Sequence, residues 1–173
     1  MNASVHGEVA IDPRAFRNAV GLFATGVAIV TTRGLQGQAI GLTVNSFASV
    51  SLDPPLVLWS LARSSANRPH FLAAPGFAVH VLAQVHVLLA KRFASPVNER
   101  FHGLDVSAGG TGAPLLNDCA VRLECWRHDT VEAGDHDIFI GRVVHIATPD
   151  NSPTPLVFHR GAFVDFDSCV VVK

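Results

Sequence analysis

Short connections between strand-like runs are the feature that most restricts how this chain folds. Residues 27–33 (VAIVTTR) and 38–44 (QAIGLTV) flank the segment GLQG, which predicts a β-hairpin. Parallel strands need crossover connections of about a dozen residues or more, and the connections here are too short. About seven strands with two or three outer helices therefore predict a mainly β fold, a small antiparallel barrel. The further predicted strands are 46–52, 56–62, 77–82, 119–133, 136–148, 156–161 and 162–166, the last two finishing the sheet.

The predicted helices have recognisable start signals. Asp12 is a good N-cap and Pro13 suits the first helical position, so a helix begins there. This helix is expected to stop near Thr25-Gly26. Long loops in compact domains are usually functional, so the one long predicted loop is of interest. The two other predicted helices and this loop are 64–73, 84–94 and 95–118.

The composition favours a single domain that associates with itself. The 173 residues suit one domain over 1–173, with a core of about 12–167. Charged residues make up 16% of the chain, below the usual value of about 25%. Because so little charge keeps a small surface hydrated, we expect a homo-oligomer. The formal net charge is −1 and the 13 Lys and Arg are scattered, which argues against a nucleic-acid partner.

Cysteine use and apolar segments bear on the location of the protein. The three cysteines, Cys119, Cys125 and Cys169, are odd in number and lack CxxC spacing, which favours reduced thiols. The N-terminal residues lack the basic segment and apolar core of a signal peptide. The apolar stretch 77–90 is interrupted by two His and a Gln and is too short to cross a bilayer. We therefore expect a cytoplasmic protein with no membrane association.

Three stretches carry side chains that suit an aromatic, phosphorylated ligand. Residues 41–55 hold short hydroxyl and amide groups that suit a planar ring, although Thr and Ser are ordinary on half-exposed strands. Residues 63–69 combine a helix start with an Arg, which suits a phosphate or plain N-capping. Lys91 and Arg92 suit a phosphate or complement a helix dipole. No GxxxxGK or GxGxxG loop occurs, which argues against a P-loop or Rossmann nucleotide site.

The segment GDHDIFIG (134–141) joins turn residues to an apolar strand. Because side chains alternate along a strand, Asp135 and Asp137 should point away from the face that His136 uses. Chemistry based on paired carboxylates is therefore not expected. Ile138 and Ile140 are expected to anchor the strand in the barrel. The nine His show no HExxH or HxH spacing, so no metal site is expected.

Four stretches carry a resemblance to a known family. They are FRNAVGLFATGVAIVTT (16–32), GLTVNSFASVSLDPPLVLWSL (41–61), LLAKRFA (88–94) and GDHDIFIGRV (134–143). In order and spacing, over roughly residues 14–166, the chain resembles the short-chain flavin reductases. These are reductase components of two-component flavin-dependent monooxygenases, similar to 4-hydroxyphenylacetate and phenol hydroxylase reductases.

The resemblance implies a fold, a reaction and partners. The implied fold is a dimeric FMN-binding split barrel with flavin sites near the subunit interface. The implied reaction is hydride transfer from NADH or NADPH to FMN or FAD. The implied partner is a flavin-dependent monooxygenase that receives the reduced flavin.

The resemblance also assigns roles to matching positions. The implied residues are Thr43, Val44, Asn45, Ser46 and Phe47 beside the isoalloxazine ring, Ser60 and Leu61 at a strand end beside the flavin, Ser64, Ser65 and Asn67 in the phosphate-side turn, Arg92, Phe93 and Ala94 at the phosphate or adenylate end, and His136, Phe158, His159, Arg160 and Gly161 beside the nicotinamide. His136 is expected to position the nicotinamide. Asn67-Arg68-Pro69 departs from the more usual Thr or Met, which leaves the choice between FMN and FAD open.

Two alternative functions remain at this point. The same barrel suits an oxidoreductase that holds FMN tightly and reduces another acceptor. It also suits a non-catalytic module that binds flavin or haem as a carrier or sensor. The sequence does not distinguish NADH from NADPH.

Overall fold

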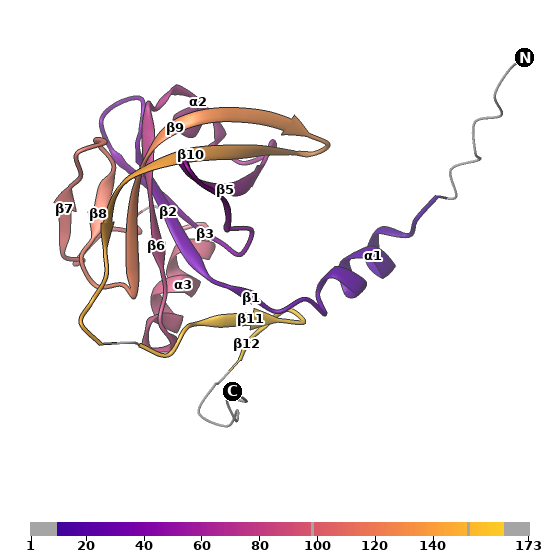
Figure 1. Cartoon of the computed structure of the whole chain (residues 1–173). Coiled ribbons are helices and arrows are strands. Elements are labelled where there is room, and N and C mark those ends of the chain that lie inside the picture. The colour runs from indigo at the N-terminus through magenta and orange to yellow at the C-terminus, as the bar shows by residue number, and fades with distance from the viewer. Residues whose placement is uncertain (1–9, 98, 152, 165–173) are drawn as a thin grey trace, which may run out of the picture.

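The computed structural model describes residues 10–164 except 98 and 152, and its centre is one antiparallel sheet (Figure 1). The seven strands are β2 (Ala28–Arg33), β3 (Ala39–Val44), β4 (Ala48–Leu52), β5 (Pro55–Ala62), β6 (Gly76–Val81), β9 (Val121–Ala133) and β10 (His136–Ala147). Their order is β3-β2-β6-β9-β10-β5-β4, and each neighbouring pair is antiparallel. The prediction of a mainly β, antiparallel fold is confirmed.

The two edge strands of this sheet are consecutive in the sequence. β3 lies at one end of the strand order and β4 at the other. The short link between them is Asn45, Ser46 and Phe47. The barrel is therefore split between β3 and β4, and the link that spans the split carries residues predicted to contact the flavin.

Two smaller sheets flank the barrel. β1 (Thr25–Gly26), β11 (Val157–His159) and β12 (Ala162–Val164) form a separate three-stranded sheet. The prediction that the last strands finish the main sheet is therefore wrong, because β11 pairs with β1 through Thr25 opposite Phe158. β7 (Val106–Ala108) and β8 (Pro114–Leu116) pair within the segment predicted to be a loop. Residues 1–9 and 165–173, including Cys169 and the end of the last predicted strand, lie outside the described residues.

Aromatic side chains fill the barrel core. Trp59 stacks on Phe139 with ring centroids 4.7 Å apart, and it meets Phe71 and Phe77 edge-on at 4.8 and 5.8 Å. All four side chains are at most 2% exposed. Replacing one such ring by alanine typically costs about 3–5 kcal/mol of stability. These rings therefore fix β5, β6, β10 and the helix that carries Phe71 relative to one another.

The β9–β10 hairpin corrects one prediction. Its turn includes Gly134, whose φ of 62° suits glycine. Along β10 the buried positions are Asp137, Phe139 and Gly141. Ile138 and Ile140 lie on the other face and are only half-buried. Phe139, and not the two isoleucines, therefore anchors this strand in the core.

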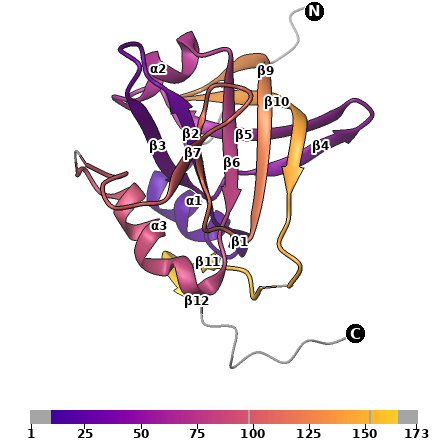
Figure 2. The ribbon, with the colours of Figure 1, turned by 90° about the vertical axis from the view of Figure 1, so that its left-hand side faces the viewer.

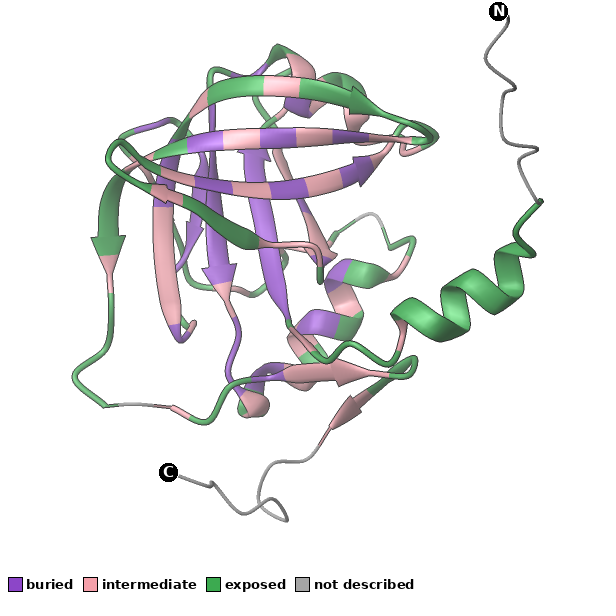
Figure 3. Ribbon diagram, turned by 45° about the vertical axis from the view of Figure 1, so that its right-hand side comes forward, coloured by how far each residue is buried: buried purple, intermediate pink, exposed green. Residues whose placement is uncertain are grey.

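Helix α1 (Pro13–Val20) begins as predicted and ends earlier than predicted. The Asp12 carboxylate accepts hydrogen bonds from the backbone N–H of Arg14 (3.3 Å) and Ala15 (3.0 Å). The helix extends away from the barrel (Figure 1), and all of its residues are exposed (Figure 3). Its apolar stripe therefore packs on no described part of the chain.

Two further helical segments close the barrel. α2 (Arg68–Ala73) inserts Phe71 into the aromatic core. A 3₁₀ turn, η1 (Gln84–His86), leads into α3 (Val87–Ala94). The Thr43 hydroxyl of β3 donates to the Ala90 carbonyl of α3 at 2.7 Å. α3 and β4 lie on opposite sides of the molecule (Figure 2).

Candidate functional site

A cavity of about 910 Å³ opens beside the split of the barrel. Its volume lies within the range of about 300–1,000 Å³ that is usual for small-molecule sites. It brings together five residues predicted to bind cofactors, namely Asn45, Ser46, Phe158, Arg160 and Gly161. The complete lining adds Arg17, Asn18, Val20, Gly21, Phe23 and Thr25. The walls therefore come from α1 and the turn after it, the β3–β4 link and the β11–β12 hairpin.

Polar groups in this wall lack partners. The Thr25 hydroxyl is buried and has no hydrogen-bond partner among the described residues. Asn45 is exposed at the cavity, and its side chain makes no hydrogen bond with any described residue. Buried polar groups in native proteins are usually satisfied, so an orphaned hydroxyl in a cavity indicates a ligand. These groups fit the polar edge of a flavin ring.

Arg17 and Arg160 give the cavity a positive character. Neither guanidinium has a hydrogen bond or an ion pair with the described part of the chain. Arg160 has a φ of 51° and Gly161 a φ of 82°, as in a two-residue type I′ hairpin turn. The Arg160 N–H donates to the Gly21 carbonyl at 2.9 Å, which ties this turn to the end of α1. An arginine held in a strained backbone conformation beside a cavity fits an anionic ligand such as a phosphate.

One face of β5 and β10 leads from this cavity to His136. The Ser60 N–H donates to the Ser46 hydroxyl at 2.9 Å. Ser60 lies opposite Ile138, and two residues further along Ala62 lies opposite His136. Residues opposite each other share a face, and two residues span about 7 Å. His136 therefore lies on the same face as the cavity, within the reach of a second ligand stacked there.

His136 is held by the aspartate that precedes it. Its Nδ1 lies 2.7 Å from the Asp135 carboxylate, and because a carboxylate only accepts, Nδ1–H is the donor. This bond leaves Nε2 for a ligand, and it holds the pKa of Asp135 below its usual value. The prediction that Asp135 points away from His136 is therefore wrong, because Asp135 belongs to the turn. The prediction is correct for Asp137, which is buried on the opposite face.

The predicted phosphate-side turn lies beside His136. The Arg63 N–H donates to the Asp135 carbonyl at 2.9 Å, which joins this turn to the GDH corner, residues 134–136. The Ser65 hydroxyl accepts from the Asn67 N–H at 3.2 Å. Ser64 is exposed. The turn is thus placed at the His136 end of the shared face and away from the lining of the cavity.

Several predicted residues support the site from behind. The Arg92 guanidinium donates to the carbonyls of Glu99 (2.8 Å) and His102 (2.6 Å). Phe93 is buried against Phe101, and Thr43 binds α3. Their contact with a cofactor stays a prediction. The predicted residues that do not line the cavity are Thr43, Val44, Phe47, Ser60, Leu61, Ser64, Ser65, Asn67, Arg92, Phe93, Ala94, His136 and His159.

Six residues that line the cavity were not predicted from the sequence. They are Arg17, Asn18, Val20, Gly21, Phe23 and Thr25, which lie in a stretch that resembles the family but were given no role at the cofactor. Their place in the stretch 16–32, which carries the family resemblance, is the signal that could have identified them. A helical pattern alone does not show which partner covers the helix.

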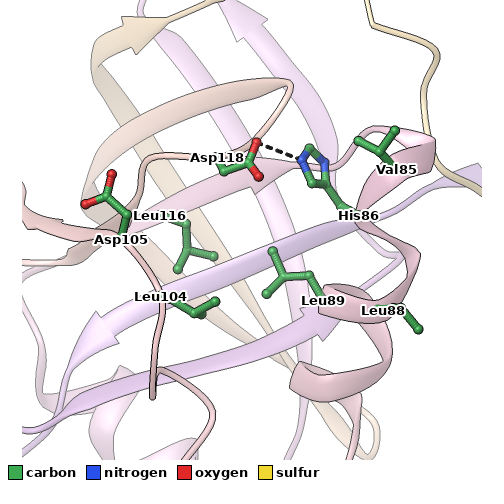
Figure 4. Close-up of a pocket in the computed structure, with 8 residues that line it drawn as sticks. All are labelled: Val85, His86, Leu88, Leu89, Leu104, Asp105, Leu116 and Asp118. Carbon is green, nitrogen blue, oxygen red and sulfur yellow. Dashed lines mark hydrogen bonds and ion pairs between the residues drawn. The ribbon is translucent and has the colours of Figure 1, made fainter.

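A second, smaller cavity of about 260 Å³ lies on the α3 side (Figure 4). Val85, Leu88, Leu89, Leu104 and Leu116 give it apolar walls, with His86, Asp105 and Asp118 at its rim. The Ala83 N–H donates to His86 Nδ1 at 3.0 Å, so Nε2–H donates to Asp118 at 3.1 Å. None of the predicted cofactor residues lines this cavity.

The described residues were compared with three other kinds of functional feature: a metal cluster, a membrane-spanning helix and a reactive thiol. No cluster of three or more His, Cys, Asp or Glu side chains that would hold a metal occurs in the described part of the chain. Among the described residues, no helix has the length and apolar character needed to cross a membrane. Burial raises the pKa of Cys119 to about 11 and that of Cys125 to about 12. Both thiols are therefore unreactive near neutral pH.

Comparison with known proteins identifies the family. Residues 20–167 match the flavin reductase like domain. The chain is 47% identical over 153 residues to the FMN reductase (NADH) SmoA of Agrobacterium fabrum, covering 88% of this chain and 86% of that protein. It is 39% identical over 150 residues to the reductase component of a flavin-dependent trigonelline monooxygenase from Acinetobacter baylyi, covering 87% of this chain. The chain spans about half the length of some curated relatives, 48% of the trigonelline component among them.

A solved structure agrees in fold. The NADH:FAD oxidoreductase of Streptomyces globisporus, determined with NAD and FAD fragments, superposes with a TM-score of 0.84. It is 35% identical, and the match covers 94% of this chain and 99% of that one. The resemblance inferred from sequence is confirmed. The chain belongs to the flavin reductase like family.

Proposed function

We propose that the chain is a flavin reductase that transfers a hydride from NADH or NADPH to FMN or FAD. The reduced flavin then leaves for a partner flavin-dependent monooxygenase. The observation that carries the proposal is the cavity at the barrel split, with an orphaned Thr25 hydroxyl and two unpaired guanidinium groups within the described chain. The names of the relatives support the same activity.

The residues have distinct tasks in this proposal. When bound, the flavin and the nicotinamide themselves supply the hydride chemistry. Thr25, Asn45 and Ser46 offer hydrogen bonds to the ring, and such groups favour the negative charge that develops on reduction. Arg17 and Arg160 bind phosphate groups. His136 Nε2 orients the nicotinamide, because transfer requires the two rings to approach to about 3–3.5 Å.

A second copy of the chain is proposed to complete the site. Phe16 is 58% exposed and Phe23 is 78% exposed, and Phe23 also lines the cavity. Such apolar groups on a projecting helix are typical of an interface. We therefore propose a homodimer whose partner covers α1 and the open side of the cavity. Light scattering should give the mass of two chains, each 18.4 kDa; a single-chain mass at micromolar concentration would contradict the dimer.

The proposed location is the cytoplasm, where reduced nicotinamide cofactors are available. Both described cysteines are free, which supports a reducing compartment. Fractionation of cells into cytoplasm, periplasm and medium, with detection of the protein in each fraction, would locate it. Recovery with the periplasm or the medium would contradict this proposal.

The test of function is NAD(P)H oxidation with all four pairings of NADH or NADPH and FMN or FAD. A desalted protein that is colourless and active only with added flavin supports release of reduced flavin. Under anaerobic conditions, the reduced flavin formed should exceed the protein concentration many times over. A yellow protein after desalting would favour the tight flavoprotein, and no oxidation under any condition would favour the non-catalytic module.

A further inference from the structure

A buried ion pair lies directly behind the GDH corner. Arg68 Nε is 2.5 Å from one Asp137 carboxylate oxygen, and Nη2 is 3.3 Å from the other. The Asp137 side chain is 1% exposed and that of Arg68 is 26% exposed. Glu132 lies 3.9 Å from Arg68 and 3.3 Å from Arg63, so it forms the outer edge of the same charge cluster. This bidentate geometry fixes the relative orientation of the guanidinium and the carboxylate as well as the distance between them.

The pair joins two segments that the resemblance assigns to different cofactors, the 64–67 turn to the flavin phosphate and His136 to the nicotinamide. Asp137 immediately follows His136 on β10, so fixing Asp137 also fixes the backbone position of His136. Arg68 is the first residue of α2 and immediately follows the 64–67 turn. The backbone bond from Arg63 to Asp135 is a second tie between the same segments. One tie precedes His136 and the other follows it, so the histidine lies between two fixed points.

Arg68 supplies the polar side-chain contacts that hold the start of α2 to β9 and β10. Asn67 occupies the N-cap position, and its side chain forms no capping hydrogen bond. Only the Ser65 hydroxyl and backbone bonds stabilise the turn from within. Phe71 packs α2 on Phe139 of β10 from the core side. The ion pair with Asp137, together with the Arg63–Asp135 bond, holds the turn before α2 against β10. The ion pair also engages the Arg68 guanidinium, which leaves Ser64, Ser65 and Asn67 as the phosphate-side groups.

We propose that Arg68 and Asp137 are positioning residues that hold His136 and the 64–67 turn in one fixed relation, so that nicotinamide binding depends on the pair. The proposal rests on the proposed function. Neither residue touches the reacting atoms; both act through the segments that they join. Arg68 is accordingly a positioning residue and not a phosphate ligand.

A positioning role and a purely structural role make different predictions for paired substitutions. Arg68→Met alone leaves a buried carboxylate without its partner, which lowers stability. The double variant R68M/D137N removes both charges, so it no longer buries the unpaired carboxylate that destabilises the single variant, and part of the lost stability should return. A structural role predicts that the KM for NADH recovers together with the melting temperature. A positioning role predicts that the KM stays raised, because the tie is still missing.

The expected result is a KM for NADH raised about tenfold in both variants, with kcat changed less, because small misplacements of a binding group have large kinetic effects. Arg127→Met is the matched control. Arg127 donates to the Phe71 and Leu72 carbonyls at the other end of α2, so its loss loosens the same helix without touching the tie. The KM for NADH of R127M should remain within about twofold of the native value. An equal rise in R127M would overturn the proposal, since the effect would then belong to helix stability.

Amide hydrogen exchange gives a readout that needs no cofactor. Exchange at residues 63–68 and 134–138 should accelerate in R68M/D137N while the rest of the barrel keeps its protection. Unchanged exchange there, or a double-variant KM within about twofold of the native value, would overturn the positioning role. A native chain that oxidises neither NADH nor NADPH with either flavin would instead refute the proposed function, and the exchange experiment would still decide whether the pair holds the two segments.

Discussion

The cavity side and the α3 side of the barrel differ in whether their polar side chains have hydrogen-bond partners within the chain. On the α3 side, His80 is fully buried, its Nδ1–H donates to the Ile29 carbonyl (3.1 Å), and its Nε2 accepts from the Leu116 N–H (3.0 Å). On the cavity side, the Thr25 hydroxyl and the Arg160 guanidinium have no hydrogen-bond partners among the described residues. Buried polar groups that satisfy one another stabilise the fold, and groups left unpaired are available to a ligand. Substitutions on the first side should therefore change stability, and those on the second should change binding.

The largest expected effect is on the α3 side. His80→Leu leaves the Leu116 N–H and the Ile29 carbonyl without partners, and each such group costs about 1–3 kcal/mol. We expect the free energy of unfolding to fall by about 4 kcal/mol, measured by urea denaturation. The exposed His128 provides the matched control, since His128→Leu should change stability by less than about 0.5 kcal/mol. A raised flavin KM in a folded His80→Leu protein would break the division between the two sides.

The same histidine predicts how stability depends on pH. Burial lowers the pKa of His80 from 6.5 to about 4. The unfolded chain therefore binds a proton that the folded chain does not, so stability is complete above pH 6.5 and falls as the pH drops towards 4. The loss reaches about 3 kcal/mol, from 1.36 kcal/mol for each of about 2.5 pH units.

The Asp137 carboxylate also loses its stabilising contribution as the pH falls, but in a lower pH range than His80. Arg68 holds the pKa of Asp137 below 3.8, so its contribution is complete above that value and is lost only at lower pH. Between pH 6.5 and 4 the His80 effect should dominate. The free energy of unfolding, measured by urea denaturation at each pH, should fall between pH 6.5 and 4 for the native chain. It should change much less over the same range for His80→Leu. An equal slope in both proteins would show that another group titrates.

On the cavity side, Arg160→Asn should separate binding from stability. Asparagine tolerates the left-handed backbone at φ 51° better than arginine does, so stability should rise by up to about 1 kcal/mol. The loss of a charge-assisted hydrogen bond to a phosphate should raise the flavin KM about tenfold. Arg33→Asn is the control, because Arg33 binds the Gly37 and Gly112 carbonyls away from the cavity. An unchanged flavin KM in Arg160→Asn would remove Arg160 from the phosphate site.

The sequence predicted the strands better than their partners. The hairpin from 27 to 44 was predicted from turn chemistry and alternation, which are local properties. The pairing of β11 with β1 was missed, because nothing local in either strand shows which distant edge it joins. The sequence also does not show which surface covers the apolar face of α1, since a helical pattern carries no information on the partner that it packs against.

The sequence predicted the class of ligand at the candidate site better than it predicted which residues line the cavity. Because side chains alternate along a strand, Ile138 and Ile140 share the face of His136. If His136 faces a ligand, both isoleucines lie outside the core, and the sequence already contains this information. The tie between Arg68 and Asp137 joins residues 69 positions apart, and single-sequence spacing does not reveal such a contact. Matching a family segment also does not separate residues that line this cavity from residues outside its lining, such as Arg92 and Phe93, whose contact with a cofactor stays a prediction.

The smallest expected effect tests that last distinction at Thr43. Its hydroxyl donates to the Ala90 carbonyl at 2.7 Å, so the structure uses it to hold α3 against β3. Thr43→Val keeps the shape and the β propensity of the side chain and removes only this hydrogen bond, which should lower stability by about 1 kcal/mol. The flavin KM should change by less than about threefold, because the Thr43 side chain does not line the cavity. A tenfold rise without loss of stability would place the hydroxyl against the flavin, and the boundary between the two sides would then have to move to include β3.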